Sequence, residues 1–204
     1  KEFMAKLNMD IEQHRVYHAQ AVQMIGNALV NLGEVQQAQL IYIDEVKYLE
    51  SVGLTGIESY RCICDALSVV YNQLHSYNEA YKWGMKAKAA FEKAQVYNYP
   101  YIRCLANLAL SMSNMGQSVW AKILIDVVME NIDKGAGLDN NVTTLISSSS
   151  QVSSDSIRTQ YDLNINKTSM VALLSNAAMI YESVGCLPDA ISAIKRAVDA
   201  SKKH

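Results

Sequence analysis

Hydrophobic residues follow a helical period in four segments of this 204-residue chain. In each segment, apolar or small side chains recur at positions i, i+3, i+4 and i+7, which places them on one face of an α-helix. The four sets are Val22, Ile25, Gly26 and Leu29; Cys64, Leu67, Ser68 and Tyr71; Leu105, Leu108, Ala109 and Met112; and Leu174, Ala177, Ala178 and Tyr181. The third member of each set is small, so we expect a second helix to cross closely at that point.

Each helical segment ends at the same kind of turn. An apolar residue precedes the turn position, which is Gly33, His75, Gly116 or Gly185, and an alanine follows five positions later. Glycine readily takes the left-handed conformation that ends a helix, and we expect His75 to have this conformational role in the second turn. The alanines lie in a second helix and let it approach the first. They are Ala38, Ala80, Ala121 and Ala190. The pattern predicts four helix-turn-helix hairpins.

These positions are similar to the signature positions of the tetratricopeptide repeat. The turns at 33, 75 and 116 are 42 and 41 positions apart, against a usual period of about 34. The chain therefore resembles the long-repeat branch of this family, seen in kinesin light chains, spindle-orientation adaptors and peptide-sensing bacterial regulators. The resemblance implies an all-α, right-handed superhelical solenoid of about four repeats. We expect one domain over residues 1–204, with repeats at approximately 10–52, 57–96, 100–134 and 168–201 and a polar, serine-rich insertion at 135–167.

Composition narrows the classes of partner. The formal net charge is −2, which argues against nucleic acid because phosphate binding needs clustered Lys and Arg. Lys82, Lys86 and Lys93 share one helix face, which we interpret as a solvated outer surface. No run of about 18 apolar residues occurs, so we expect no membrane insertion. The first residues are too polar for a signal peptide, and a cytoplasmic protein is expected.

No set of residues resembles an active site, so we predict that the chain is not an enzyme and has no catalytic residues, metal ligands or cofactor. His14 and His18 could reach one metal ion from a helix, but Arg15 stands where the zinc-protease motif needs Glu. Four cysteines lie among apolar neighbours, and we interpret them as reduced, mostly buried thiols. We interpret Trp83 and Trp120 as packing residues.

The resemblance implies a concave groove lined by the first helix of each repeat. Asn and Gln side chains both donate and accept hydrogen bonds, so they can pair with the main chain of an extended peptide. The candidate peptide-binding residues are Gln23, Asn27, Asn31, Asp65, Asn72, Arg103, Asn107 and Asn176. The alternative is that these polar side chains only solubilise an exposed face.

One subclass of the family grips the C-terminal carboxylate of chaperones with Lys, Arg and Asn side chains. The matching positions here are Gln23, Asn27, Ala66, Arg103 and Asn107. Only Asn27 and Arg103 fit that set, so a receptor for chaperone tails is not predicted.

The sequence therefore predicts a non-catalytic scaffold for protein–protein interaction, which binds an extended peptide or a partner protein in its groove. One alternative is a structural segment of a larger assembly, or a self-associating domain that forms a homo-oligomer. A second alternative is the peptide-sensing half of a bacterial transcriptional regulator, which would need a DNA-binding domain outside this sequence.

Overall fold

A computed structural model describes residues 2–134 and 167–202, and these residues form helices without any strand. The helices are α1 (Glu2–Asn31), α2 (Val35–Ser51), α3 (Glu58–Gln73), α4 (Tyr77–Lys93), α5 (Tyr99–Asn114), α6 (Ser118–Lys134), α8 (Lys167–Ser183) and α9 (Leu187–Lys202). Apart from Lys167, the predicted insertion at 135–167 lies outside the described residues. The division into four repeats within a single domain stays a prediction.

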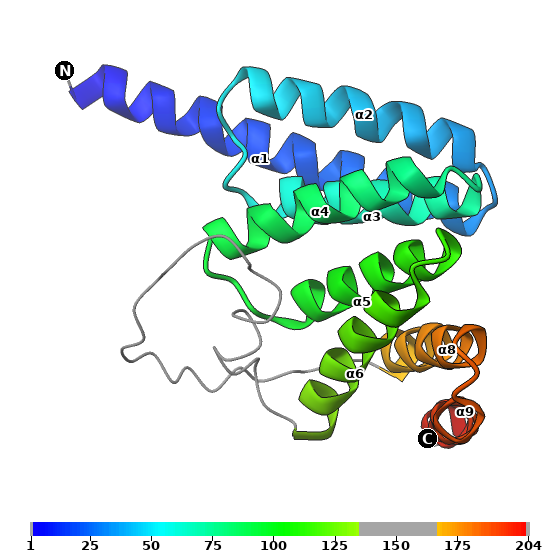
Figure 1. The fold of residues 1–204 in the computed structure, drawn as a ribbon. Coiled ribbons are helices and arrows are strands. Elements are labelled where there is room, and N and C mark those ends of the chain that lie inside the picture. Colours follow the sequence, from blue (N-terminus) through cyan, green and yellow to red (C-terminus); the bar gives the residue numbers. More distant parts are fainter. Residues whose placement is uncertain (1, 135–166, 203–204) are drawn as a thin grey trace. The chain divides into compact units, whose positions relative to one another are not determined.

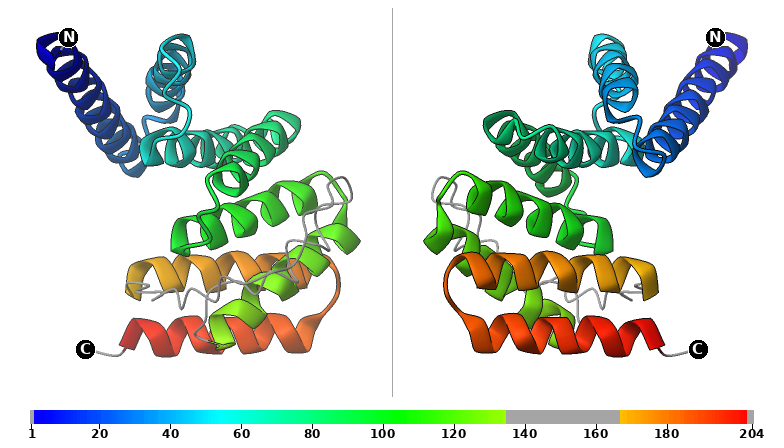
Figure 2. Two further views of the ribbon diagram at one scale, coloured as in Figure 1. Left: turned by 90° about the vertical axis from the view of Figure 1, so that its left-hand side faces the viewer. Right: turned by 90° about the vertical axis from the view of Figure 1, so that its right-hand side faces the viewer.

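The helices fall into two compact units, Lys1–Ala94 and Gln95–His204. In the first unit, α1 pairs with α2 and α3 pairs with α4, and α3 also packs against both α1 and α2 (Figure 1). In the second unit, α5 pairs with α6 and α8 pairs with α9, and α8 also packs against both α5 and α6. The antiparallel course of α8 and α9 is visible in Figure 2. Each unit therefore consists of two helical hairpins.

The four predicted turns have one common geometry. The turn residues Gly33, His75, Gly116 and Gly185 all have positive φ, at 84°, 57°, 78° and 75°. After each of them, a backbone N–H donates to the carbonyl five residues earlier, as in Glu34 N to Leu29 O at 2.9 Å. The equivalent bonds are Ser76 to Tyr71, Gln117 to Met112 and Cys186 to Tyr181. This pattern is the Schellman C-cap, so the prediction for His75 is confirmed.

The alanine that follows each turn lies in the first turns of the second helix and makes the same backbone hydrogen bond in all four hairpins. Its N–H donates to the carbonyl of the residue directly after the turn residue, and its side chain is buried. The four bonds are Ala38 to Glu34, Ala80 to Ser76, Ala121 to Gln117 and Ala190 to Cys186. Because a methyl group occupies little space, the second helix can lie close to the first where the hairpin is narrowest.

The predicted small position of the first hairpin is confirmed at Gly26. Gly26 is buried in α1, and a Cβ at this position would overlap the ring of Tyr42 from α2. Tyr42 is itself fully buried. Its hydroxyl donates a hydrogen bond of 2.8 Å to Asn27 Oδ1, which holds the ring in place. The absence of a side chain at position 26 thus determines how closely α1 and α2 pack.

The apolar stripe predicted for the first repeat is only partly buried. Ile25 is 55% exposed, although it belongs to the same periodic set as the buried Gly26. Among the described helices, α1 packs against α2 and α3. Ile25 remains open because neither helix covers its side of α1.

A polar cluster in the first unit joins three helices. Glu50 of α2 accepts a hydrogen bond of 2.8 Å from the Tyr60 hydroxyl of α3, and its Oε1 lies 2.6 Å from Lys86 Nζ of α4. The ammonium group also lies over the Trp83 ring, 4.5 Å from its centroid. Lys86 is thus half-buried and paired, so its assignment to a solvated lysine face was wrong. The hydrogen bond from Lys86 lowers the pKa of Glu50, and burial raises the pKa of Tyr60.

We predict that Gly26→Ala lowers the free energy of unfolding by up to about 2 kcal/mol. Alanine favours a helix by about 1 kcal/mol over glycine, but overpacking a filled core costs about 1–3 kcal/mol. The overpacking should win because Tyr42 cannot swing away without losing its hydrogen bond to Asn27. Urea unfolding measures the change. With Tyr42→Leu as the background, the same substitution should be neutral or stabilising, and an equal loss in both backgrounds would contradict the packing model.

We also predict that Glu50→Gln destabilises the chain at pH 7 by about 0.5–1 kcal/mol, within the range for partly exposed ion pairs. The folded state lowers the pKa of Glu50 below its ordinary value of 4.5. The stabilisation is therefore complete above that value and is lost as the pH falls through the folded pKa. Unfolding curves of the parent and the variant should differ less at pH 3 than at pH 7.

Glu79→Gln is the matched control, because the half-buried Glu79 pairs with Lys82 of its own helix and with no other helix in the described part of the chain. This substitution should change stability by no more than about 0.5 kcal/mol. If Glu50→Gln lowers the free energy of unfolding by the same amount at pH 3 and at pH 7, the charge of the Glu50 carboxylate does not stabilise the three-helix cluster.

Candidate functional site

The candidate peptide-binding residues all lie on α1, α3, α5 and α8, the first helices of the four hairpins. In the first unit α1 packs against α3, and in the second unit α5 packs against α8. Residues that are far apart in the sequence are thereby brought onto neighbouring helices within each unit.

In the first unit, the candidates differ in their access to solvent. Asn27 and Asn31 of α1 are exposed, and Gln23 of α1 and Asn72 of α3 are half-buried. Asp65 of α3 is only 1% exposed. Four of the five candidates in this unit can therefore meet a ligand directly.

Asn27 has a structural contact as well as an exposed position. Its Oδ1 accepts the hydrogen bond from the Tyr42 hydroxyl, and that hydroxyl also lies 3.5 Å from the Gln23 backbone oxygen. The side-chain oxygen of Asn27 is thus engaged within the hairpin. Its NH₂ group is the part best suited to donate to the carbonyl of a bound peptide.

In the second unit, Arg103 of α5 and Asn176 of α8 are half-buried. Asn107 of α5 is 5% exposed, and its backbone oxygen accepts a hydrogen bond of 3.0 Å from Ser111 Oγ. Asp65 and Asn107 are thus shielded in this conformation, and six of the eight candidates reach the surface. Their contact with a peptide stays a prediction.

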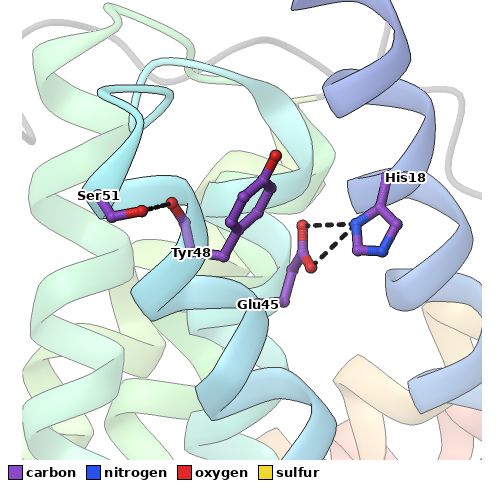
Figure 3. A network of polar contacts seen from close by, with 4 residues as sticks. All are labelled: His18, Glu45, Tyr48 and Ser51. Carbon is purple, nitrogen blue, oxygen red and sulfur yellow. Dashed lines mark hydrogen bonds and ion pairs between the residues drawn. The ribbon is translucent and has the colours of Figure 1, made fainter.

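A separate polar network joins α1 to α2 (Figure 3). His18 Nδ1 lies 3.1 Å from Glu45 Oε2, and the ring of His18 meets the ring of Tyr48 edge-on at 6.0 Å between centroids. Ser51 Oγ donates to the Tyr48 carbonyl at 2.7 Å. Glu45 is buried, whereas His18 is exposed. Sequence reasoning assigned no role to Glu45, because burial of a carboxylate cannot be read from helical spacing.

The two histidines that share a helix face have different partners. His14 Nδ1 lies 2.6 Å from the backbone oxygen of Asp10, whereas His18 contacts Glu45. Within residues 2–134 and 167–202, no group of three or more His, Cys, Asp or Glu side chains is placed to hold a metal ion.

The cysteines are free thiols, as predicted. Cys62, Cys64 and Cys104 are buried and Cys186 is half-buried. Burial raises the pKa of the Cys64 thiol to about 12, so its reactive thiolate form is scarce at neutral pH. The interpretation of mostly buried thiols is confirmed.

Trp120 contradicts the expectation that the tryptophans serve in packing. Its side chain is 64% exposed on α6, beside Val119 at 72% and near Ile123 at 45%. The corresponding position, directly before the helix alanine, is Gln37, Glu79 or Asp189 in the other hairpins. This comparison of repeats was the sequence signal that could have revealed an exposed apolar patch in the third hairpin.

A second exposed apolar row, which we call the α9 row, follows α9. It consists of Leu187, Ile191, Ile194 and Val198, whose side chains are 42–58% exposed. The buried face of the same helix is formed by Ala190, Ala193 and Ala197. Ile194 is exposed because Ala190, Ala193 and Ala197 form the buried face of α9, which packs against α8.

None of the described helices combines the length and the apolar character needed to cross a membrane.

Comparisons with known proteins show the fold. No family model matches the chain, and no curated protein matches it. Among solved structures, BtubC (BKLC) from P. vanneervenii is similar with a TM-score of 0.60 and 12% identity; the match covers 91% of this chain and 65% of BtubC. A Podosopora anserina protein assigned as a kinesin light chain, with nearly identical TPR-like repeats, is similar in two structures at 15% identity. These have TM-scores of 0.57 and 0.54, and the matches cover 89% and 90% of this chain and 74% of that protein.

The chain thus spans just under two thirds of the length of BtubC. The matches confirm the predicted all-α helical-repeat solenoid and the resemblance to TPR-like proteins at the level of fold.

Proposed function

We propose that the chain is a non-catalytic scaffold for protein–protein interaction, which binds an extended peptide or a partner protein on the faces of its first helices. The observation that carries this proposal is the packing of the first helices, which bear the polar candidate residues. Within each unit they pack against each other, α1 with α3 and α5 with α8. Repeat stacks present such surfaces for binding because each hairpin contributes one segment of a continuous face.

The accessible candidates suit a peptide main chain. Asn31 and Asn72 can each donate and accept a hydrogen bond, and Asn27 can donate through its NH₂ group. Arg103 can bind a carboxylate or a carbonyl. A peptide in extended conformation has unpaired N–H and C=O groups at regular intervals, which such side chains can satisfy. A protein partner therefore fits this surface better than a nucleic acid, which would need a basic one.

The experiment compares proteins captured by the parent chain with those captured by two variants. The first-unit variant is Gln23→Ala, Asn31→Ala and Asn72→Ala, and the second-unit variant is Arg103→Ala and Asn176→Ala. Asn27, Asp65 and Asn107 are left intact, because Asn27 supports Tyr42 and the other two are buried. We expect at least one of the variants to bind the captured partner at least tenfold more weakly.

The matched control is Gln36→Ala with Asn78→Ala, which removes exposed amides from the second helices α2 and α4. This control should bind like the parent, and circular dichroism checks that all variants remain helical. Equal binding by the parent and both first-helix variants would refute the proposed binding face.

A second candidate function, a segment of a larger assembly or a self-associating domain, is favoured by the α9 row. Contiguous exposed apolar side chains often mark surfaces that pack against another chain. The row runs along one side of the helix at spacings of four, three and four residues, the pattern of a helix–helix seam.

Sedimentation velocity over a range of concentrations tests this second candidate. A self-associating chain should form dimers that Ile191→Gln with Ile194→Gln weakens at least tenfold, whereas Lys195→Gln on the same helix should have little effect. A parent that stays monomeric throughout the range would rule out self-association through the α9 row. The second alternative from the sequence, a peptide-sensing half of a regulator, stays a hypothesis.

A further inference from the structure

The first hairpin has a shallow hollow between α1 and α2. It is lined by Ile11, His14, Arg15, His18 and Tyr48. The four residues from α1 have the spacing i, i+3, i+4, i+7, so a single helix face carries one aliphatic side chain, two imidazoles and one guanidinium. Tyr48 from α2 completes the lining.

Arg15 carries the one formal positive charge at pH 7 among the described residues that line this hollow. Arg15 is half-buried, and its guanidinium has no hydrogen bond or ion pair with any residue whose side chain the structure describes, namely residues 10–133 and 169–202. Two acidic residues contact the described lining. Glu45 is only 4% exposed and is engaged by His18 (Figure 3), and the exposed Asp10 contacts His14 through its backbone oxygen. Glu12 and Asp44 are exposed nearby in the sequence but do not line the hollow. An incoming carboxylate would therefore meet Arg15 without a competing acidic side chain among the described residues that line the hollow.

The remaining lining is apolar and partly open. Ile11 is 43% exposed and Tyr48 is 38% exposed. The edge-on contact with His18 supports the ring of Tyr48 from one side. A ligand that placed an aliphatic or aromatic group against Ile11 and Tyr48 would bury apolar surface that the hairpin leaves in water.

We propose that this hollow, which we call the α1–α2 hollow, binds an acidic peptide segment in which a carboxylate side chain stands next to an aliphatic or aromatic side chain. Arg15 pairs with the carboxylate, since a guanidinium can donate two parallel hydrogen bonds to it. Ile11 and Tyr48 receive the apolar neighbour. His18 remains in contact with Glu45, whose side chain is only 4% exposed beneath the site.

The α1–α2 hollow is separate from the face proposed for main-chain recognition. Gln23 follows His18 by five residues, which places it about 140° further around α1. A ligand in the hollow and a peptide on the first-helix face would thus approach different sides of the same helix. The two proposals can fail independently.

Three short blocked peptides test the proposal on the full chain by NMR titration. Acetyl-Leu-Glu-amide has both required groups, acetyl-Leu-Gln-amide lacks the charge, and acetyl-Gly-Glu-amide lacks the apolar side chain. We expect the first peptide to give saturable shifts of the signals from residues 11–18 and 45–51, with an affinity at least fivefold higher than that of either other peptide. Equal affinities for all three, or no saturable shift in these segments, would overturn the proposal.

Charge variants identify the residue responsible. Arg15→Gln should weaken binding of acetyl-Leu-Glu-amide at least fivefold, and Arg15→Glu should make the chain prefer acetyl-Leu-Lys-amide. Lys47→Gln is the matched control, because it removes an exposed cation of α2 that does not line the hollow. Arg15 is only half-buried and unpaired in the described part of the chain, so its variants should keep the parent's circular dichroism and unfolding midpoint. If Lys47→Gln weakens binding as much as Arg15→Gln, general charge attraction explains the effect and the site is refuted.

Discussion

The close approach of the two helices within each hairpin is the constraint on which the rest of the structure depends. A left-handed turn residue ends the first helix, and an alanine five positions later lies buried in the second. In the first hairpin, α1 comes nearest to α2 at Gly26. Because Gly26 has no side chain, the ring of Tyr42 from α2 occupies the space where a Cβ would lie. A short helix gains little stability by itself in water, so this packing is what makes each hairpin a stable building block.

Polar contacts then connect neighbouring hairpins within each unit. In the first unit, Glu50 accepts from Tyr60 and pairs with Lys86, so that one carboxylate holds three helices together. In the second unit, the Tyr181 hydroxyl of α8 donates to Asp126 of α6, and Lys122 lies 2.7 Å from the same carboxylate. Both clusters combine a largely buried tyrosine with a carboxylate and a lysine. They orient the hairpins more specifically than apolar contacts alone, because hydrogen bonds depend on direction as well as distance.

The same architecture leaves several surfaces free for different kinds of contact. The first helices present polar side chains that suit a main chain, whereas the α1–α2 hollow combines a guanidinium with an apolar wall. The α9 row and the patch around Trp120 are apolar and exposed. Within the first unit, the hollow and the first-helix face lie on different sides of α1.

The sequence by itself determined the hairpins. Helical periodicity, the turn residues and the buried alanines are local features, and each acts through backbone geometry or side-chain size within about ten residues. For that reason His75 could be assigned a left-handed conformation without any structure, and the family-like fold could be predicted from four short segments.

Tertiary structure alone decided which polar and apolar side chains meet solvent. Asp65 and Asn107 occupy positions that spacing made equivalent to exposed ones, yet both are buried. Lys86 is half-buried rather than fully solvated because it pairs with Glu50 and lies over the Trp83 ring. Trp120 is exposed because no described helix covers it. Exposure is a property of the neighbours that surround a residue in space, and those neighbours come from distant parts of the chain that a local pattern does not encode.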